Sequence, residues 1–209
     1  MRPGETVRKI IHMIFSLLLS VPLMLSGFID PGIIYGVILA IGGTVYSVQV
    51  KGIPSWLRAG MQLPQMRQIE SVIESFEKLI NMVERDYERR SGWLGLISGL
   101  IGGTSSYFIF GRHVIYGLLG LALVDGISTI VGMNMGIKKI PFSDKTIEGT
   151  VSGFLSFLVV LSLLTSDLTG SLMVAIFSSL TELYGIEDNI TVPIVASASS
   201  YLIGMPILL

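Results

Sequence analysis

An aspartate interrupts one of the most apolar parts of the sequence. Asp125 is the one Asp, Glu, Lys or Arg in the stretch 113–137. A carboxylate near the middle of a membrane helix costs at least about 2.5 kcal/mol unless it has a partner or a wet cavity. Ser128, Thr129 and Gly132 follow at steps that place them on the same helical face. We therefore predict a functional role for Asp125; the alternative is a buried aspartate that only hydrogen-bonds a neighbouring helix.

The segment after this aspartate combines small residues with cations. These residues are Gly132, Gly136, Lys138, Lys139 and Lys145. The helix expected to follow, capped by Ser143 or Asp144, presents an amino end that favours anions. Together these features predict a polyphosphate site. The alternative is a loop whose lysines only anchor the chain on the cytoplasmic side.

Charged residues from both ends of the chain are expected at the same membrane boundary. Glu182 closes the sixth apolar stretch, and Asp188 and Asn189 lie in the turn before the last one. The residues that reach this boundary from the amino end are Arg8, Lys9 and His12. Arg8 and His12 are one helical turn apart, so they share one side of a helix. The alternative for Arg8 and Lys9 is a purely topological role.

Carboxylates without thiols suggest a site for a hard metal ion. The chain has no cysteine and only two histidines, so oxygen ligands suited to Mg²⁺ are more plausible than a thiolate site. Lysines and a helix amino end would neutralise phosphates. The residues thus predict nucleotide-dependent phosphoryl or nucleotidyl transfer to a lipid, without a Walker A or protein-kinase motif. The alternative from another class is a membrane transporter, because intramembrane carboxylates also mark ion pathways.

The composition indicates which elements must position these groups. The 209 residues are 51% hydrophobic and 14% charged, with a mean hydropathy of +0.73, which excludes a soluble globular enzyme. A net charge of −1 argues against nucleic acid as a partner. We predict an all-α polytopic membrane helix bundle in a single domain, 1–209. A bilayer needs about 20 residues per helix, and the seven candidate spans are 10–29, 31–50, 91–111, 113–137, 149–166, 168–185 and 189–209.

The distribution of lysine and arginine predicts how the chain enters the membrane. With a cytoplasmic amino terminus, seven spans leave only Arg112 of the 14 Lys and Arg on the outer side. A cleaved signal peptide is the alternative for the first span, but its apolar run is too long and no cleavage site follows it. Apolar residues at three- and four-residue steps predict a cytoplasmic amphipathic helix over about 54–90.

Four blocks of the sequence resemble the polyprenol kinases, the family of dolichol kinase, CTP-dependent diacylglycerol kinase and phytol or farnesol kinase. Their residues are Arg8, Lys9 and His12; Asp125, Gly132, Gly136 and Lys139; Lys145, Thr146, Glu148, Gly149 and Thr150; and Glu182, Asp188, Asn189 and Pro193. The blocks span nearly the whole chain in the family's order. Val124 departs from the family, which more often has glycine before the aspartate.

The resemblance implies a membrane kinase that uses CTP, with Mg²⁺, to phosphorylate an isoprenoid alcohol or a diacylglycerol-like lipid. The candidate catalytic residues are then Asp125, Glu148, Lys145 and His12, and the candidate metal ligands are Asp125, Glu148, Glu182 and Asp188. The residues expected to bind the nucleotide are Arg8, Lys9, Ser128, Gly132, Gly136, Lys139, Lys145, Thr146, Gly149 and Asn189. The runner-up is a phosphatidate cytidylyltransferase, whose longer carboxy-terminal signature this chain lacks.

The expected setting is the cell membrane, or the endoplasmic reticulum membrane in a eukaryote, with the active site on the cytoplasmic side. The expected partners are CTP, a membrane lipid alcohol and the bilayer itself. In the third span, the glycines at positions 99, 102 and 103 permit close helix contact, which allows a homodimer.

Overall fold

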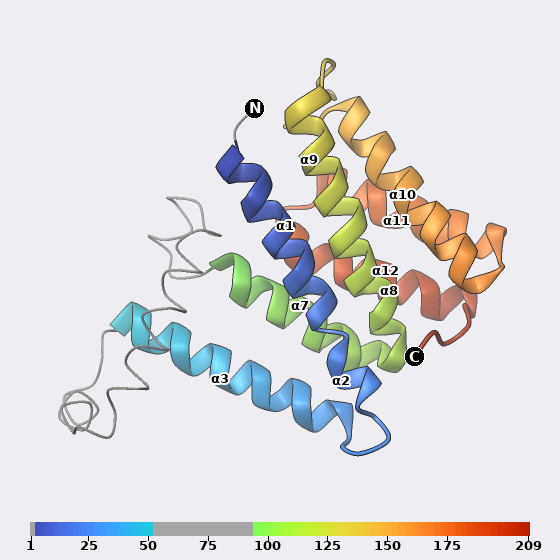
Figure 1. Cartoon of the computed structure of the whole chain (residues 1–209). Helices are drawn as coiled ribbons and strands as arrows, with labels where there is room; N and C mark the ends of the chain where they lie inside the picture. The colour runs from blue at the N-terminus through green and yellow to red at the C-terminus, as the bar shows by residue number, and fades with distance from the viewer. Residues whose placement is uncertain (1–2, 52–93) are drawn as a thin grey trace.

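The computed structural model describes residues 3–51 and 94–209, and these residues fold into a bundle of helices (Figure 1). The helices are α1 (Pro3–Leu18), α2 (Val21–Met24), α3 (Pro31–Lys51), α7 (Leu94–Phe110), α8 (Val114–Gly120), α9 (Gly126–Met135), α10 (Ile147–Thr165), α11 (Leu168–Tyr184) and α12 (Asp188–Ile203). A 3₁₀ turn, η2 (Gly111–His113), precedes α8, and a π-helical turn, η3 (Leu121–Asp125), joins α8 to α9. The amphipathic helix predicted over 54–90 falls outside the described residues.

Each of the apolar stretches predicted from the sequence contains helix. Three helical stretches are long and apolar enough to cross a bilayer, and they are Glu5–Met24, Gly95–Met135 and Ile147–Thr165. Two shorter apolar helices cover Pro31–Ser47 and Leu168–Tyr184. The described residues therefore form an all-α bundle that fits a membrane protein, whereas the number of spans rests on the sequence.

The chain turns sharply between α7 and α8 (Figure 1). Gly111, at the start of this turn, has a φ of 60°, a left-handed conformation that favours glycine. The neighbouring Arg112 donates from Nη1 to the carbonyl of Leu209 at 3.0 Å and from Nη2 to Oγ of Ser26 at 2.7 Å. The long apolar stretch is therefore divided into two differently directed helices where the sequence predicted a break.

The outward faces of the bundle are apolar. On α10, Leu155, Val159 and Leu163 are exposed, the last of them to 78%, and Phe177 is exposed on α11. A soluble monomer rarely shows contiguous apolar patches of this kind, but such side chains are well solvated by lipid hydrocarbon. The surface therefore supports the membrane location independently of helix length.

Small polar residues fill the contacts between helices. Ser178 on α11 and Ser197 on α12 are fully buried. Each hydroxyl donates to a carbonyl of its own helix, Ser178 to Val174 at 2.7 Å and Ser197 to Pro193 at 2.6 Å. Serine is short enough to let helices approach closely, and these bonds satisfy its hydroxyl inside the bundle.

Glycines bring α10 against the backbone of the η3–α9 segment. A Cβ at Gly153 would lie 2.6 Å from the carbonyl oxygen of Val124, and one at Gly149 would lie 2.5 Å from that of Ser128. A side chain cannot fit in so little space, so these contacts require glycine. They hold α10 beside the segment that carries Asp125.

Gly153→Ala is expected to lower the free energy of unfolding by about 1–3 kcal/mol, because α10 must move away from η3 to make room for the methyl group. Thermal unfolding in detergent measures the effect. Gly43→Ala is the matched control, since a Cβ at Gly43 would meet nothing within 4 Å. Equal melting temperatures for the two variants would contradict the packing role of Gly153.

Candidate active site

Asp125 ends the π-helical turn η3 and is only 3% exposed. Nζ of Lys9 on α1 donates to its Oδ2 at 2.6 Å, and Nε2 of His12 lies 3.6 Å from the same oxygen. Oγ1 of Thr129 donates to Oδ1 at 3.4 Å. The carboxylate thus faces α1 inside the bundle. π-Helical turns recur at functional sites in other proteins.

Lys145, in the loop before α10, joins two further carboxylates. Its Nζ donates to Oε1 of Glu182 at 2.7 Å and to Oδ2 of Asp188 at 2.9 Å. Glu182 is 1% exposed, and its Oε1 also accepts from Oγ of Ser128 at 2.7 Å. Burial acts to lower the pKa of Lys145, but the nearby carboxylates, led by Glu182, outweigh it and raise that pKa above its ordinary value. Lys145 is therefore cationic at neutral pH.

Three carboxylates converge from separate parts of the chain. One oxygen each of Asp125, Glu182 and Asp188 lies within 4.8 Å of the others. Among the described residues, no group hydrogen-bonds Oε2 of Glu182 or Oδ1 of Asp188, although both atoms are buried. Buried oxygens without a partner are costly, and a hard divalent ion would satisfy them. Asp125, Glu182 and Asp188 are thus a group that could hold a metal ion, and they are three of the four residues that the sequence analysis put forward as metal ligands.

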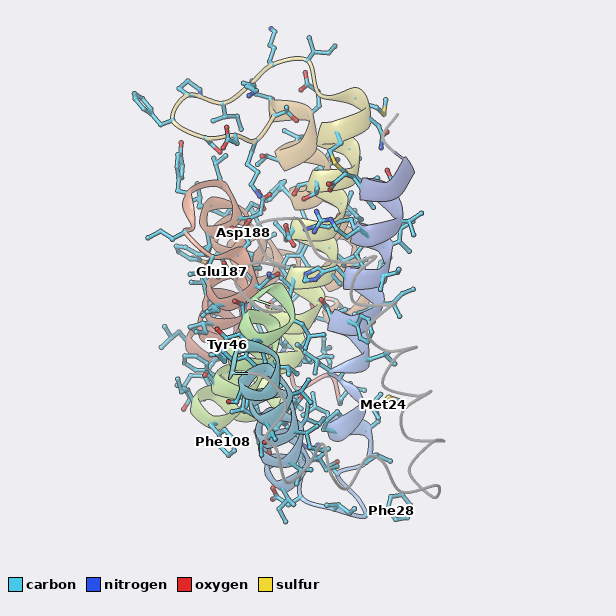
Figure 2. All side chains as sticks on the ribbon, turned by 90° about the vertical axis from the view of Figure 1, so that its left-hand side faces the viewer. Met24, Phe28, Tyr46, Phe108, Glu187 and Asp188 are labelled. Carbon is cyan, nitrogen blue, oxygen red and sulfur yellow. The ribbon has the colours of Figure 1, made fainter. Side chains whose placement is uncertain are left out.

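The charged groups lie at one end of a cavity of about 1380 Å³. Figure 2 shows Glu187 and Asp188 toward the end of the bundle that carries the loop between α9 and α10, and Met24 and Phe28 at the opposite end. The rest of the cavity runs between apolar residues of α1, α3 and α7. The polar residues lining the cavity include Arg8, Lys9, His12, Asp125, Ser128, Thr129, Lys139, Lys145, Thr146, Asp188 and Asn189.

Three of the predicted nucleotide-binding residues line the cavity, and the side-chain contacts described for two of them are with residues outside the carboxylate cluster. Arg8 pairs with Glu5 of its own helix, with 3.0 Å between Nη2 and Oε2. Asn189 donates from Nδ2 to Oε1 of Glu187 at 3.1 Å. Lys139 is exposed at the cavity edge. The cation of α1 that contacts Asp125 is therefore Lys9, one position after Arg8.

Glu148, predicted as a metal ligand or base, lies apart from the other carboxylates. Its Oε2 accepts from the backbone N–H of Ile137 at 3.0 Å and of Lys138 at 3.3 Å. In the part of the chain that the structure describes, Glu148 belongs neither to the cavity lining nor to the carboxylate cluster. The structure gives it a different task, which is to hold the loop after α9 against the start of α10.

The residue that caps α10 is Thr146, and not Ser143 or Asp144 as predicted. Oγ1 of Thr146 accepts from the N–H of Gly149 at 3.2 Å, while the N–H of Ile147 donates to a loop carbonyl at 2.9 Å. Amides that are already hydrogen-bonded are not available to a phosphate. The anion site expected at this helix end therefore lacks two of its donors.

The glycines of the predicted phosphate loop pack against neighbouring residues. A Cβ at Gly132 would lie 2.9 Å from Oγ1 of Thr146, and one at Gly136 would lie 2.7 Å from it. Gly149 contacts α9, as described above. These glycines therefore let α9 and the start of α10 pack closely, and Gly132 and Gly136 also border the cavity.

The sequence assigned no role to the hydroxyl of Thr150. This residue lies one turn after Thr146 on α10 and lines the cavity, and its Oγ1 is buried with no hydrogen bond to any described residue. The sequence analysis also did not predict the contact of Lys9 with Asp125. The sequence feature that could have indicated it is the three-residue step from Lys9 to His12, which places both side chains on one helical face.

Comparison of the chain with protein families, curated proteins and solved structures finds no match. The resemblance to the polyprenol kinases therefore rests on the four sequence blocks alone.

Proposed function

We propose that this protein is a CTP-dependent membrane kinase that transfers the γ-phosphate to the hydroxyl of a lipid alcohol, of the isoprenoid or diacylglycerol type. The observation that carries the proposal is the composition of one cavity. Its polar end holds carboxylates and lysines within hydrogen-bonding distance of one another, and it continues between apolar helices. A phosphoryl transfer to a lipid needs both environments side by side.

The charged residues supply the groups that position a triphosphate. Lys139 and Lys145 line the cavity on the side of the loop, and Arg8 and Lys9 line it on the side of α1. Such cations neutralise phosphate oxygens and favour the charge that develops during transfer. In this proposal Lys9 and Lys145, which now bind carboxylates, turn to the phosphates when the nucleotide binds.

The carboxylates of Asp125, Glu182 and Asp188 would hold Mg²⁺. When bound there, the ion would neutralise charge on the phosphates of CTP. The protein's own task is to present three oxygens from different elements in one place, and the packing of η3, α11 and α12 against one another does this. Glu148 is left out of this metal set because of its bonds to the loop backbone.

His12 is the best-placed proton acceptor for the lipid hydroxyl. It lines the cavity within 3.6 Å of Asp125, and it lies deeper along α1 than Arg8 and Lys9. In the proposed step the lipid oxygen bonds to the γ-phosphorus, the bond from that phosphorus to the β–γ bridging oxygen breaks, and CDP leaves. His12 takes the hydroxyl proton.

The seven-span topology of the sequence is part of this proposal. With the amino terminus in the cytoplasm, the loop between α9 and α10 and the start of α12 lie on the cytoplasmic side, where CTP is present. The lipid alcohol reaches the same site from the membrane. The proposed location is the cell membrane, or the endoplasmic reticulum membrane in a eukaryote.

The test is a transfer assay with the purified protein in sealed vesicles that contain a lipid extract and Mg²⁺. CTP labelled at the γ-phosphate should label lipid, and CTP labelled at the α-phosphate should not. Only protein whose cytoplasmic side faces the added nucleotide should react. Transfer of the α label would identify a cytidylyltransferase, and the absence of any lipid labelling would contradict both enzyme assignments.

A further inference from the structure

The apolar part of the cavity lies between α1, α3 and α7. Its lining residues on α3 and α7 include no charged side chain, and Ile41 and Leu100 are examples from each helix. The same cavity reaches Lys9 and Asp125 at its other end. We call this apolar part the α1/α3/α7 groove. A ligand that fills the whole cavity must therefore be apolar along most of its length and polar at one end.

The groove is open toward the outside of the bundle that the described residues form. Leu18 of α1 and Ile41 of α3 both line it, yet they are 53% and 59% exposed. Side chains that border a cavity and are also half exposed show that residues 3–51 and 94–209 do not complete the wall between these helices. An apolar chain can therefore enter from the surrounding hydrocarbon, without passing through water.

Gly99 forms part of the groove wall on α7. It is buried, but a Cβ at this position would meet nothing within 4 Å. Gly102 and Gly103, one turn later on the same helix, differ. A Cβ at Gly102 would lie 2.4 Å from the carbonyl oxygen of Asn189, and one at Gly103 would lie 3.4 Å from Leu118. These two glycines serve helix packing, whereas Gly99 borders the cavity.

We propose that the α1/α3/α7 groove binds the hydrocarbon chain of the acceptor alcohol, and that Gly99 sets the width of the chain that fits. The continuity of the groove with the charged end places the hydroxyl of such a ligand near His12 and Asp125. The identity of the ligand as an acceptor rests on the proposed kinase function. Binding of the chain does not depend on turnover, so the two proposals are tested separately.

The test uses a long-chain prenol that carries a photoreactive diazirine halfway along its chain. It is added to the full-length protein in detergent without nucleotide, illuminated, and the cross-linked peptides are identified by mass spectrometry. We expect cross-links within 31–51 and 94–110 that unlabelled prenol competes away. Gly99→Leu should reduce them about tenfold, because its side chain occupies the width of the groove.

Gly43→Leu is the matched control. It makes the same change in a helix at a position with nothing within 4 Å, and it lies outside the cavity lining. Gly43→Leu should leave the cross-links unchanged, and Gly99→Ala, which adds only one methyl group, should reduce them less than Gly99→Leu. Size-exclusion profiles and melting temperatures identify any variant that does not fold. If Gly99→Leu does not fold, the extent of cross-linking is compared between the unmodified protein and Gly99→Ala instead.

Cross-links on the outer faces of α10 and α11, or cross-links in the groove that Gly99→Leu does not reduce, would overturn the inference. If phosphate transfer occurs but the groove is not labelled, the chain-binding proposal fails and the kinase proposal stands. If the groove is labelled but no transfer occurs, the kinase proposal fails and the groove remains a binding site for a long-chain alcohol.

Discussion

Asp125→Asn is expected to lower phosphoryl transfer from CTP by about 10²–10³-fold, because one anionic oxygen is lost where charge must be balanced during transfer. The substitution keeps the shape of the side chain. It removes the charge that now pairs with Lys9 at 2.6 Å. Initial rates of γ-label transfer at saturating CTP and lipid measure the effect, and near-normal turnover would remove Asp125 from the catalytic machinery.

Asp167→Asn is the matched control for this prediction. Asp167 caps α11, where its Oδ1 accepts from the N–H of Gly170 at 3.0 Å. Asparagine caps helices as well as aspartate does, so transfer should stay near the wild-type rate.

Asp125→Asn also leaves the ammonium group of Lys9 buried beside a neutral amide. Comparison with the double variant Lys9→Met/Asp125→Asn by thermal unfolding separates this loss of stability from the loss of chemistry.

Lys145→Met is expected to cost about 3–5 kcal/mol of stability, because it removes the cation from a buried carboxylate. The carboxylate of Glu182 is fully buried, and Lys145 and Ser128 are its hydrogen-bond partners among the described residues. Lys145→Met should also abolish transfer, since the proposed phosphate contact is lost. Thermal unfolding in detergent and the γ-label assay measure the two effects.

The double variant Lys145→Met/Glu182→Gln distinguishes the charge pair from general damage. Removing both charges should restore about 0.5–3 kcal/mol relative to the sum of the single changes. Transfer should remain abolished, because both the phosphate contact and one metal ligand are missing. Additive stability losses would show that Lys145 and Glu182 are not energetically coupled.

Much of the helical framework was predictable, because hydropathy is a local property of the chain. The stretch 31–50 became α3 (Pro31–Lys51), and 149–166 became α10 (Ile147–Thr165). A predicted helix end was wrong where the backbone conformation ended the helix earlier than hydropathy indicated. α12 ends at Ile203 instead of continuing to 209, because Gly204 adopts a left-handed φ of 77° and a proline follows at position 206.

The sequence alone also determined which residues needed a partner. An aspartate inside an apolar helix is costly unless something compensates its charge, so the need of Asp125 for a partner could be identified without coordinates. Hydropathy and charge counts cannot identify the compensating group, because several cations lie at the same membrane boundary.

Only the tertiary structure decided these pairings. Lys9 contacts Asp125 across a separation of 116 residues, whereas the adjacent Arg8 pairs within its own helix. Glu182 enters the carboxylate cluster, whereas Glu148 bonds to the loop backbone. The physical reason is that such contacts depend on the rotation and spacing of packed helices. Contacts such as that of Gly153 with Val124 set this spacing, and their effect appears only once the helices are assembled.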